Sequence, residues 1–269
     1  MRAARTQHRG MEYRLLGQMD VRGRSGPVPL GGLKQRTVLA SLLLDHERAV
    51  DADRLIDDVW GPRPPAKAIV SLRAYLTNLR RVLHEPGVPP RIVTTSIGYR
   101  LDLGQDFFDV EQFRALAERG RRSLDTGNAS GADRLFTAAL RLWRERPTQE
   151  FDLARGHRDR WEDDRAGVVE GFVAAALDLG RHTEIVDDIE AQLRRTPLRE
   201  TLWCQLMIAL HRGSRRAEAL AVYGRAASAF FDAADLAPGE RLEETYRRVR
   251  AHDQTLEWSP VRVVEQLVG

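Results

Sequence analysis

The segment SLRAYLTNLRRVL, residues 71–83, limits the possible fold more than any other part of the sequence. Its leucines recur at spacings of four, three and four, and are Leu72, Leu76, Leu79 and Leu83. At about 100° per residue this spacing places them in one narrow stripe, the side by which a helix packs on its neighbours. The opposite side carries arginines, small residues, a threonine and an asparagine, and no acidic residue occurs between Lys67 and His84. The sequence therefore predicts a packed helix with a basic outer face.

The residues before this helix predict a small sheet and two more helices. Residues 11–30 alternate apolar and polar side chains between Gly and Pro breaks, which indicates two or three short antiparallel strands. A helix is expected over residues 34–45. A second begins after Asp51, a favourable N-cap, and ends at Trp60, where Gly and Pro follow. The apolar side of the first of these helices is predicted to comprise Leu33, Val38, Leu39, Leu42 and Leu43.

The third helix is predicted over residues 66–84, and a β-hairpin follows it. The hairpin covers residues 92–103, with Gly98 at its centre. Strands, three helices and a hairpin, in this order, indicate a winged helix-turn-helix with an additional N-terminal antiparallel sheet. The predicted fold is mainly α with a small β component.

Charge is divided unevenly along the chain. Residues 1–104 hold 17 Lys and Arg against 10 Asp and Glu, whereas the rest holds 25 against 29, so a net charge of +7 precedes one of −4. This division suits a module that faces nucleic acid joined to one that faces protein. No apolar run is long enough to cross a membrane and no signal peptide is recognisable, so a cytoplasmic, nucleoid-associated protein is expected. The one cysteine, Cys204, excludes an internal disulfide and is expected to be a buried structural thiol.

The basic face of the third helix is the part of a winged helix that is exposed to DNA. A major groove admits one α-helix, in which Arg pairs with guanine and Asn with adenine. The residues expected to contact bases are Arg73, Thr77, Asn78 and Arg81, and those expected to contact phosphates are Lys34, Arg36, Lys67 and Ser71. The wing is expected to act through Thr95, Ser96 and Arg100. For the helix taken alone, a solvated arginine-rich face is the alternative interpretation.

Several motifs occur together in this chain: MEYRLLG, PLGGLKQRTVLASLLL, DADRLIDDVWG, the Leu- and Arg-rich helix, a wing that ends in GYRL, and a later ALAVY. In combination they resemble those of the SARP family, antibiotic-pathway transcriptional activators of actinobacteria. The resemblance implies a response-regulator-type winged helix at residues 11–104 and a bacterial transcriptional activator domain at residues 105–258. Members open at a residue that matches Met11, so the preceding residues are expected to be dispensable. Members usually carry an Arg near the wing tip, where this chain has Thr95 and Ser96, which departs from the pattern for insertion into the minor groove.

The second module contains tetratricopeptide-like repeats. In a unit of about 34 residues that has Trp203 at its fourth position, the large, small, aromatic and small positions are filled by Leu206, Ala219, Tyr223 and Ala226. One unit earlier, Gly180 and Pro197 fall on the turn and terminal positions. A weaker third repeat spans residues 127–139, and a charged insertion over residues 144–165 is expected to lengthen a helix. An ordinary all-α bundle is the alternative, and either would offer a groove for helices or peptides.

No motif supports an enzyme. The histidines are scattered, HExxH is absent and no two lie at metal-ligand spacing on one helix, so no metal site is predicted. A GxxxxGK[ST] phosphate loop and a nucleophile elbow are also absent. We expect a protein without catalytic residues and without cofactors.

The sequence thus predicts a sequence-specific DNA-binding transcriptional activator, and the family resemblance implies that it serves an antibiotic or other secondary-metabolite gene cluster. Its expected partners are double-stranded promoter DNA and a second protomer on DNA, because one winged helix offers less surface than specific complexes bury. Direct-repeat sites and recruitment of RNA polymerase holoenzyme, through its sigma and alpha subunits, are what the family resemblance implies. The alternative is a helical-repeat adaptor whose N-terminal module binds protein instead of DNA.

Overall fold

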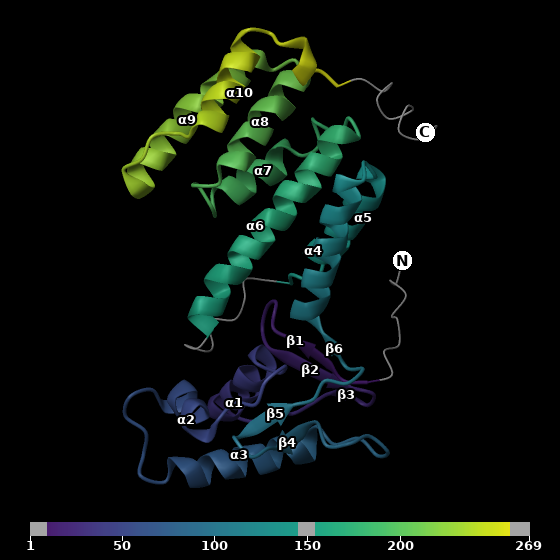
Figure 1. Ribbon diagram of the computed structural model, residues 1–269, viewed down its shortest axis with the longest axis vertical. Coiled ribbons are helices and arrows are strands. Elements are labelled where there is room, and N and C mark those ends of the chain that lie inside the picture. The colour runs from purple at the N-terminus through teal and green to yellow at the C-terminus, as the bar shows by residue number, and fades with distance from the viewer. Residues whose placement is uncertain (1–9, 145–153, 259–269) are drawn as a thin grey trace. The chain divides into compact units, whose positions relative to one another are not determined.

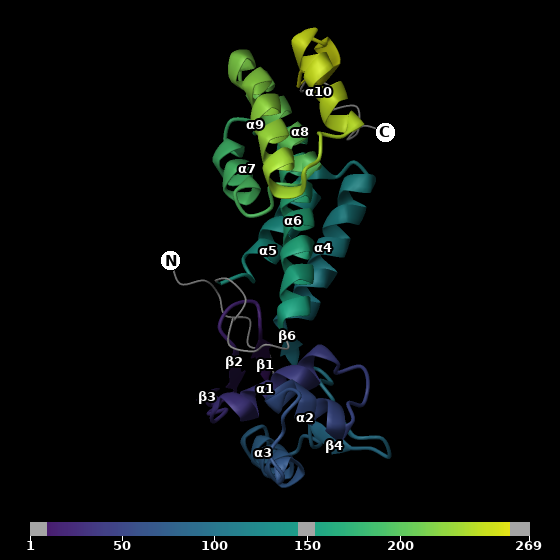
Figure 2. The ribbon, with the colours of Figure 1, turned by 90° about the vertical axis from the view of Figure 1, so that its left-hand side faces the viewer.

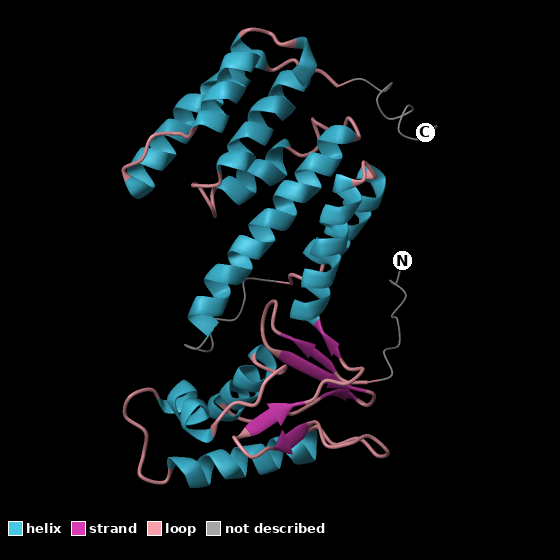
Figure 3. Ribbon diagram, viewed as in Figure 1, coloured by secondary structure: helices cyan, strands magenta, loops and turns pink. Residues whose placement is uncertain are grey.

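The computed structural model describes residues 10–144 and 154–258, and within them the chain forms two compact units (Figure 1). The first comprises the described residues of the ranges 1–113 and 142–160, and the second those of 114–141 and 161–269. Among these residues, strands occur only before position 109, and helices make up most of the remainder (Figure 3). The prediction of a mainly helical chain with a small N-terminal sheet is confirmed. The residues before Met11 that were expected to be dispensable lie outside the described part, except Gly10.

The N-terminal sheet has four strands in the order β3-β2-β1-β6. These are β1 (Glu12–Arg14), β2 (Asp20–Gly23), β3 (Gly26–Pro27) and β6 (Phe107–Phe108). The predicted antiparallel strands are confirmed, with Tyr13 of β1 opposite Val21 of β2. The parallel partner β6, which sets Phe108 beside Tyr13, was not predicted. Strand β6 has only two residues, too few to show an alternation of apolar and polar side chains, and its partner β1 lies far away in the sequence.

Asp109, the first residue of helix α4 (Asp109–Asp125), closes the end of strand β1. Its carboxylate accepts hydrogen bonds from the backbone N–H groups of Leu15, at 2.8 Å, and of Leu16, at 2.9 Å. Burial raises the pKa of Asp109 to about 6, even though both N–H groups act to lower it. The buried carboxylate therefore joins the sheet to the start of α4.

The three predicted helices of the first unit are present within two residues of their expected ends. They are α1 (Leu33–Leu44), α2 (Ala52–Trp60) and α3 (Ala68–Val82), followed by the hairpin β4 (Ile92–Thr94) and β5 (Tyr99–Leu101). Asp51 caps α2 as predicted, accepting the N–H of Arg54 at 2.8 Å. One expectation for α1 was wrong, because Leu33 is 52% exposed. Helix α1 packs on α2, α3 and β5, so the more central Gln35, Thr37 and Ser41 are buried in addition to its apolar residues.

The second half of the described chain is helical. After α4 come α5 (Ala129–Leu140), α6 (Ala154–Asp178), α7 (Val186–Leu193), α8 (Glu200–Arg212), α9 (Arg216–Ala234), α10 (Glu240–Arg250) and the 3-10 helix η1 (Gln254–Leu256). Helix α8 packs against α7, α9 and α10 (Figure 2). The predicted lengthening insertion covers residues 144–165. Residues 145–153 lie outside the described part, and residues 154–165 belong to α6, which has 25 residues.

Four of the repeat positions predicted around Trp203 are buried in the core of this helical unit. They are Trp203, Leu206, Ala219 and Ala226. Tyr223 is half-buried and packs on Tyr246, with 4.6 Å between the ring centres. Cys204 is 4% exposed, and burial raises the pKa of its thiol, as suits the structural role predicted for it. None of the described helices is both long enough and apolar enough to cross a membrane.

Candidate DNA-binding surface

Helix α3 carries its leucine stripe inward and its basic face outward. The stripe residues Leu72, Leu76, Leu79 and Leu83 are each at most 2% exposed. Through this side α3 contacts α1, α2 and β4, and Figure 1 shows it at the boundary of its unit with these elements on one side. The exposed residues of the helix are Val70, Arg73, Ala74, Thr77 and Arg81. The outer face therefore combines cationic donors with small side chains that allow close approach to a groove.

Asn78 lies at the margin of this face and uses both ends of its amide within the protein. Its Nδ2 donates to Oε1 of Gln35 at 2.9 Å, and its Oδ1 accepts from Nη2 of Arg81 at 2.7 Å. Gln35 in turn donates to the carbonyl of Leu30 at 2.7 Å. These bonds hold the Arg81 guanidinium in one orientation, which reduces the entropy it would lose on pairing with a base. The sequence could not show this, because Gln35 lies on another helix.

Two helix N-termini beside this face have no side-chain cap. Helix α1 follows Gly32 and α3 follows Lys67, and neither N-cap residue makes a side-chain bond, nor does either first turn contain an acidic residue. Helix α2 differs, with Asp51 as its cap and Asp53 in its first turn. Open N–H groups and the positive end of the helix dipole favour anions. Within this unit α1 and α3 are therefore the helices suited to receive phosphates.

The four predicted phosphate contacts differ in how far they reach solvent. Lys34 is exposed, with its ammonium group 5.3 Å from the centre of the Trp60 ring, and Lys67 is exposed directly before α3. Ser71 is half-buried near the start of α3. Arg36 is also half-buried, and its Nη2 donates to the carbonyl of Met19 at 3.3 Å. The two lysines are thus placed to reach a ligand without rearrangement, whereas Arg36 is directed toward the sheet.

The wing ends in a tight turn with a mixed polar and apolar tip. The N–H of Thr95 donates to the carbonyl of Gly98 at 2.8 Å and closes the turn. Ser96 and Ile97 between them are exposed, Ile97 by 68%, and Arg100 is exposed on β5. Gly98 has φ +153°, and a Cβ at this position would overlap the carbonyl oxygen of Val50. Ile97 was not among the predicted wing residues, since one apolar residue in a turn produces no pattern.

Arg80 fastens the wing to α3. Its Nε donates to the carbonyl of Ile92 at 2.9 Å, its Nη2 donates to Oγ1 of Thr94 at 2.8 Å, and its guanidinium carbon lies 6.0 Å from the centre of the Tyr99 ring. Val50 and Tyr99 exchange two backbone hydrogen bonds of 2.8 Å, which add the residue before α2 to the hairpin. The outer face of α3 and the wing are therefore held in a fixed relation to one another.

Arg91 connects the base of the wing with the end of α3 and with the sheet. Its side chain is 3% exposed and forms ion pairs with Asp106 and Glu85, the second at 2.8 Å. It also donates to the carbonyl of Leu83 at 2.8 Å, while Asp106 accepts the N–H of Met11 at 2.8 Å. Burial lowers the pKa of Arg91, but the hydrogen bonds to Asp106 and Glu85 outweigh it, and the pKa is raised overall. This cluster was not predicted from the sequence.

The fold and this surface define a winged-helix regulator joined to a helical repeat domain. Residues 108–250 match the family model described as "Bacterial transcriptional activator domain", and residues 29–101 match "Transcriptional regulatory protein, C terminal". The regulatory protein DnrI of Streptomyces peucetius is 31% identical over 255 residues, which cover 90% of this chain and 93% of DnrI. The chain belongs to the SARP family of DNA-binding transcriptional regulators.

A similar relative has also been solved as a structure. The transcriptional regulatory protein EmbR of Mycobacterium tuberculosis is 30% identical over 254 residues, 93% of this chain and 66% of EmbR. Its structure in complex with a low affinity phosphopeptide superimposes with a TM-score of 0.86, covering 90% of this chain and 65% of that one. This chain thus spans just under two thirds of the length of EmbR. These relatives are named as regulators of transcription, and none of those described here is named as an enzyme.

Proposed function

We propose that this protein activates transcription of a secondary-metabolite gene cluster by binding promoter DNA through α3 and the wing. The observation that carries the proposal is the exposed, acid-free face of α3 beside two helix N-termini without caps. A protein-binding face has no need of this combination, because helix starts that lack acidic residues and carry exposed lysines select for anions. The protein has no catalytic role in this proposal, and it acts in the cytoplasm on the nucleoid.

The proposed base contacts are Arg73, Thr77, Asn78 and Arg81. Arg81 is already oriented by Asn78, so the pair acts as one unit, in which Asn78 reads a base or positions the arginine that does. Thr77 donates its hydroxyl to the carbonyl of Arg73 at 2.8 Å and adds little bulk to the face. The phosphate contacts at the starts of α1 and α3 are Lys34, Lys67 and Ser71. Arg36 contacts a phosphate only after its hydrogen bond to the carbonyl of Met19 breaks. Thr95, Ser96 and Arg100 place the wing against the neighbouring backbone.

The test begins with a duplex selected from a random library by the full chain. Fluorescence anisotropy then measures binding to this duplex and to a scrambled one over a range of salt concentrations. Arg81→Ala should weaken binding to the selected duplex by about 1–3 kcal/mol and barely affect the scrambled one. Lys67→Ala should weaken binding to both duplexes alike and reduce the salt slope by about one.

Arg119→Ala is the matched control, because it removes the same charge from an exposed position on α4. It should leave both affinities unchanged. If Arg81→Ala and Asn78→Ala retain the full preference for the selected duplex, the base-reading face is assigned wrongly. If the chain binds no duplex at any salt concentration, the alternative of a helical-repeat adaptor replaces the proposal.

Cooperation between two protomers on a direct repeat is the second part of the proposal. One winged helix buries less surface than specific recognition usually requires, so two copies are expected on one face of the duplex, about one helical turn apart. Analytical ultracentrifugation should show a mainly monomeric chain alone and two chains on a two-site duplex. A tight dimer without DNA, or saturation by one chain, would contradict this. In vitro transcription with RNA polymerase holoenzyme tests recruitment. If the protein occupies the promoter but does not increase the rate of transcription, activation is refuted.

A further inference from the structure

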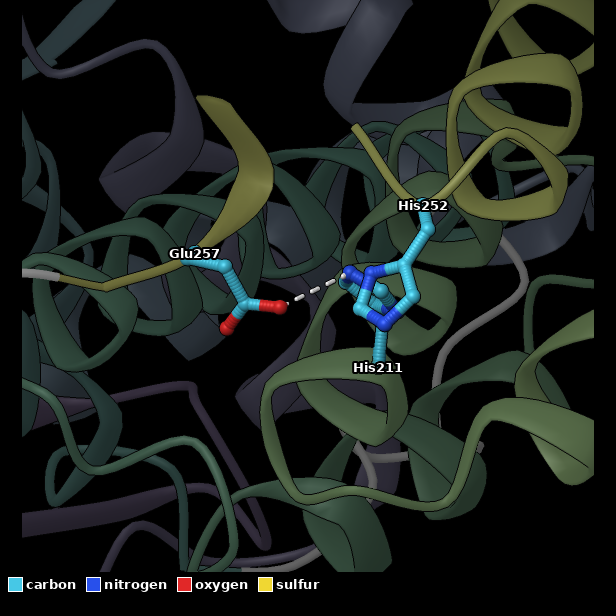
Figure 4. A group of neighbouring side chains, drawn as sticks. All are labelled: His211, His252 and Glu257. Atoms are coloured by element: carbon cyan, nitrogen blue, oxygen red, sulfur yellow. Dashed lines mark ion pairs between the residues drawn. The ribbon is translucent and has the colours of Figure 1, made fainter. Parts of the chain in front are cut away.

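Two histidines and a glutamate from separate segments meet at one end of the helical unit (Figure 4). His211 lies in the last turn of α8, His252 follows the end of α10, and Glu257 follows η1. The two imidazole rings are 5.5 Å apart between centres, with their planes at 79°. One nitrogen from each ring and one oxygen of the carboxylate all lie within 4.8 Å of one another. In Figure 4 the carboxylate points toward the two rings.

His211 is buried, yet its ring nitrogens lack hydrogen-bond partners among the described residues. The residue is 4% exposed, and both Nδ1 and Nε2 are without such a partner. Nε2 lies 3.2 Å from Oε1 of Glu257, close enough for an ion pair but without the geometry of a hydrogen bond. Buried polar groups are almost always paired, because an unsatisfied one is destabilising. An unpaired imidazole directed at a second imidazole and a carboxylate indicates a site for a ligand that all three can share.

Positive side chains lie nearby, but their donors are directed elsewhere. Nε of Arg212 donates to the carbonyl of Leu256 at 2.6 Å, and Nη2 of Arg216 donates to the carbonyl of Arg250 at 2.6 Å. Arg212 thereby fastens the segment after α10 onto α8, and Arg216 fastens the end of α10 onto α9. Burial lowers the pKa of His211, Glu257 opposes this, and His252 and the two arginines add to it.

We propose that His211, His252 and Glu257 bind one zinc ion. Two imidazole nitrogens and one carboxylate oxygen are a ligand set that zinc accepts, with a fourth position open to water. Bond lengths of about 2.0–2.2 Å hold tetrahedral ligand atoms roughly 3.4 Å apart. The pair formed by His211 and Glu257 already has this separation, at 3.2 Å. Since His252 and Glu257 are exposed, their side chains can close the remaining distance without disturbing the core.

A second group of two acidic residues and a histidine differs from the His211 group in its hydrogen bonds. His46, Glu47 and Glu111 also bring three ligand atoms within 4.8 Å. There, however, Nδ1 of His46 bonds the carbonyl of Leu43 at 2.8 Å and Nε2 bonds Glu111 at 2.7 Å. Both ring nitrogens are satisfied inside the protein, so this group needs no ion. The sequence predicted no metal site, because His211 and His252 are brought together only by the packing of α10 against α8.

The bound ion would hold the segment after α10 against the end of α8. Residues 251–257 are also held by Arg212, which bonds Leu256, and by Arg248, which bonds Asp253 and Thr255, and they include a turn in which His252 adopts φ +56°. Zinc would add three bonds that link one helix to two points of this segment. The expected effect is a higher melting temperature of the helical unit in zinc and slower hydrogen exchange in residues 251–257.

The test uses the full chain without an affinity tag. Isothermal titration calorimetry with zinc chloride measures uptake by the wild type and by His252→Asn and Glu257→Gln. These variants change exposed side chains only, and Asn tolerates the left-handed backbone of residue 252. Each should weaken zinc binding at least tenfold and remove the zinc-dependent rise in melting temperature. Cobalt, bound in place of zinc, should give the visible absorption bands of a four-coordinate ion in the wild type alone.

His84→Asn and His46→Asn are the matched controls. His84 is exposed in the first unit, and His46 belongs to the second group. Both variants should bind zinc as the wild type does. The proposal is overturned if the wild type takes up no zinc, if His252→Asn and Glu257→Gln bind it as tightly as the wild type, or if uptake is lost only in His46→Asn.

Discussion

Replacing Arg91 by methionine should detach the base of the wing from the rest of its unit. The substitution keeps most of the apolar stem but leaves Asp106 and Glu85 without their cation, although their side chains are only 7% and 12% exposed. Breaking a buried pair by removing one partner costs about 3–5 kcal/mol, because the remaining charge is uncompensated. The exposed pair of Arg54 with Asp45 gives the contrast, since removing Arg54, whose side chain is 52% exposed, should cost less than about 1 kcal/mol.

Hydrogen exchange measured by mass spectrometry suits this prediction, because the chain has two units and a single melting curve would mix them. Amides of the β4–β5 hairpin and of Met11 should exchange roughly 100- to 4,000-fold faster in Arg91→Met, if they open together with the cluster. Arg91→Met with Asp106→Asn should recover part of the loss, because the second change removes the stranded charge and retains an acceptor for the Met11 N–H. If the hairpin of Arg91→Met exchanges within tenfold of the wild type, as expected for Arg54→Ala, the cluster does not hold the wing as we argue.

Two further predictions concern the same unit. Gly98→Ala should destabilise the wing by about 2–4 kcal/mol and weaken DNA binding, because a Cβ would overlap the carbonyl of Val50. Hydrogen exchange of the hairpin and anisotropy would check it. Gly104→Ala, where a Cβ meets nothing within 4 Å, is a control for the strain of positive φ alone. Asp109, with its pKa raised from 3.8 to about 6, binds its proton more tightly in the folded chain, so its contribution to stability falls by about 3 kcal/mol as the pH rises from about 4 to 6. Asp109→Asn should lack this part of the pH dependence, and urea unfolding that changes equally with pH in both proteins would disprove the assignment.

Local patterns in the sequence were sufficient for most of the first unit. The leucine stripe of α3, the cap at Asp51 and the hairpin around Gly98 each depend on spacing within one element, and such spacing is preserved in the amino-acid order. The position of Leu33 could not be obtained this way. It continues the apolar pattern of α1, but it lies before the point where α2 and α3 cover the helix, so it remains exposed.

What the sequence did not reveal depends on pairs that are distant in the chain. Arg91 and Asp106 come from separate loops, Gln35 reaches Asn78 from another helix, and Arg80 reaches across to Thr94. The grouping of His211 with His252 is of the same kind. The amino-acid order does not show whether a single charged or polar side chain faces water or a buried partner. Only the packing of the helices and strands distinguishes a solvated side chain from a paired one.

The parallel pairing of β1 with β6 also bears on how the DNA-binding unit is made. The strand at Glu12–Arg14 emerges early in synthesis, but its neighbour at Phe107–Phe108 and the carboxylate of Asp109 appear only about a hundred residues later. Until then one edge of β1 has unpaired backbone groups, a condition that promotes association between chains. A fragment that ends at residue 104 would retain this open edge permanently. The N-terminal sheet of the winged-helix unit therefore gains its fourth strand only once the ribosome has reached the start of α4.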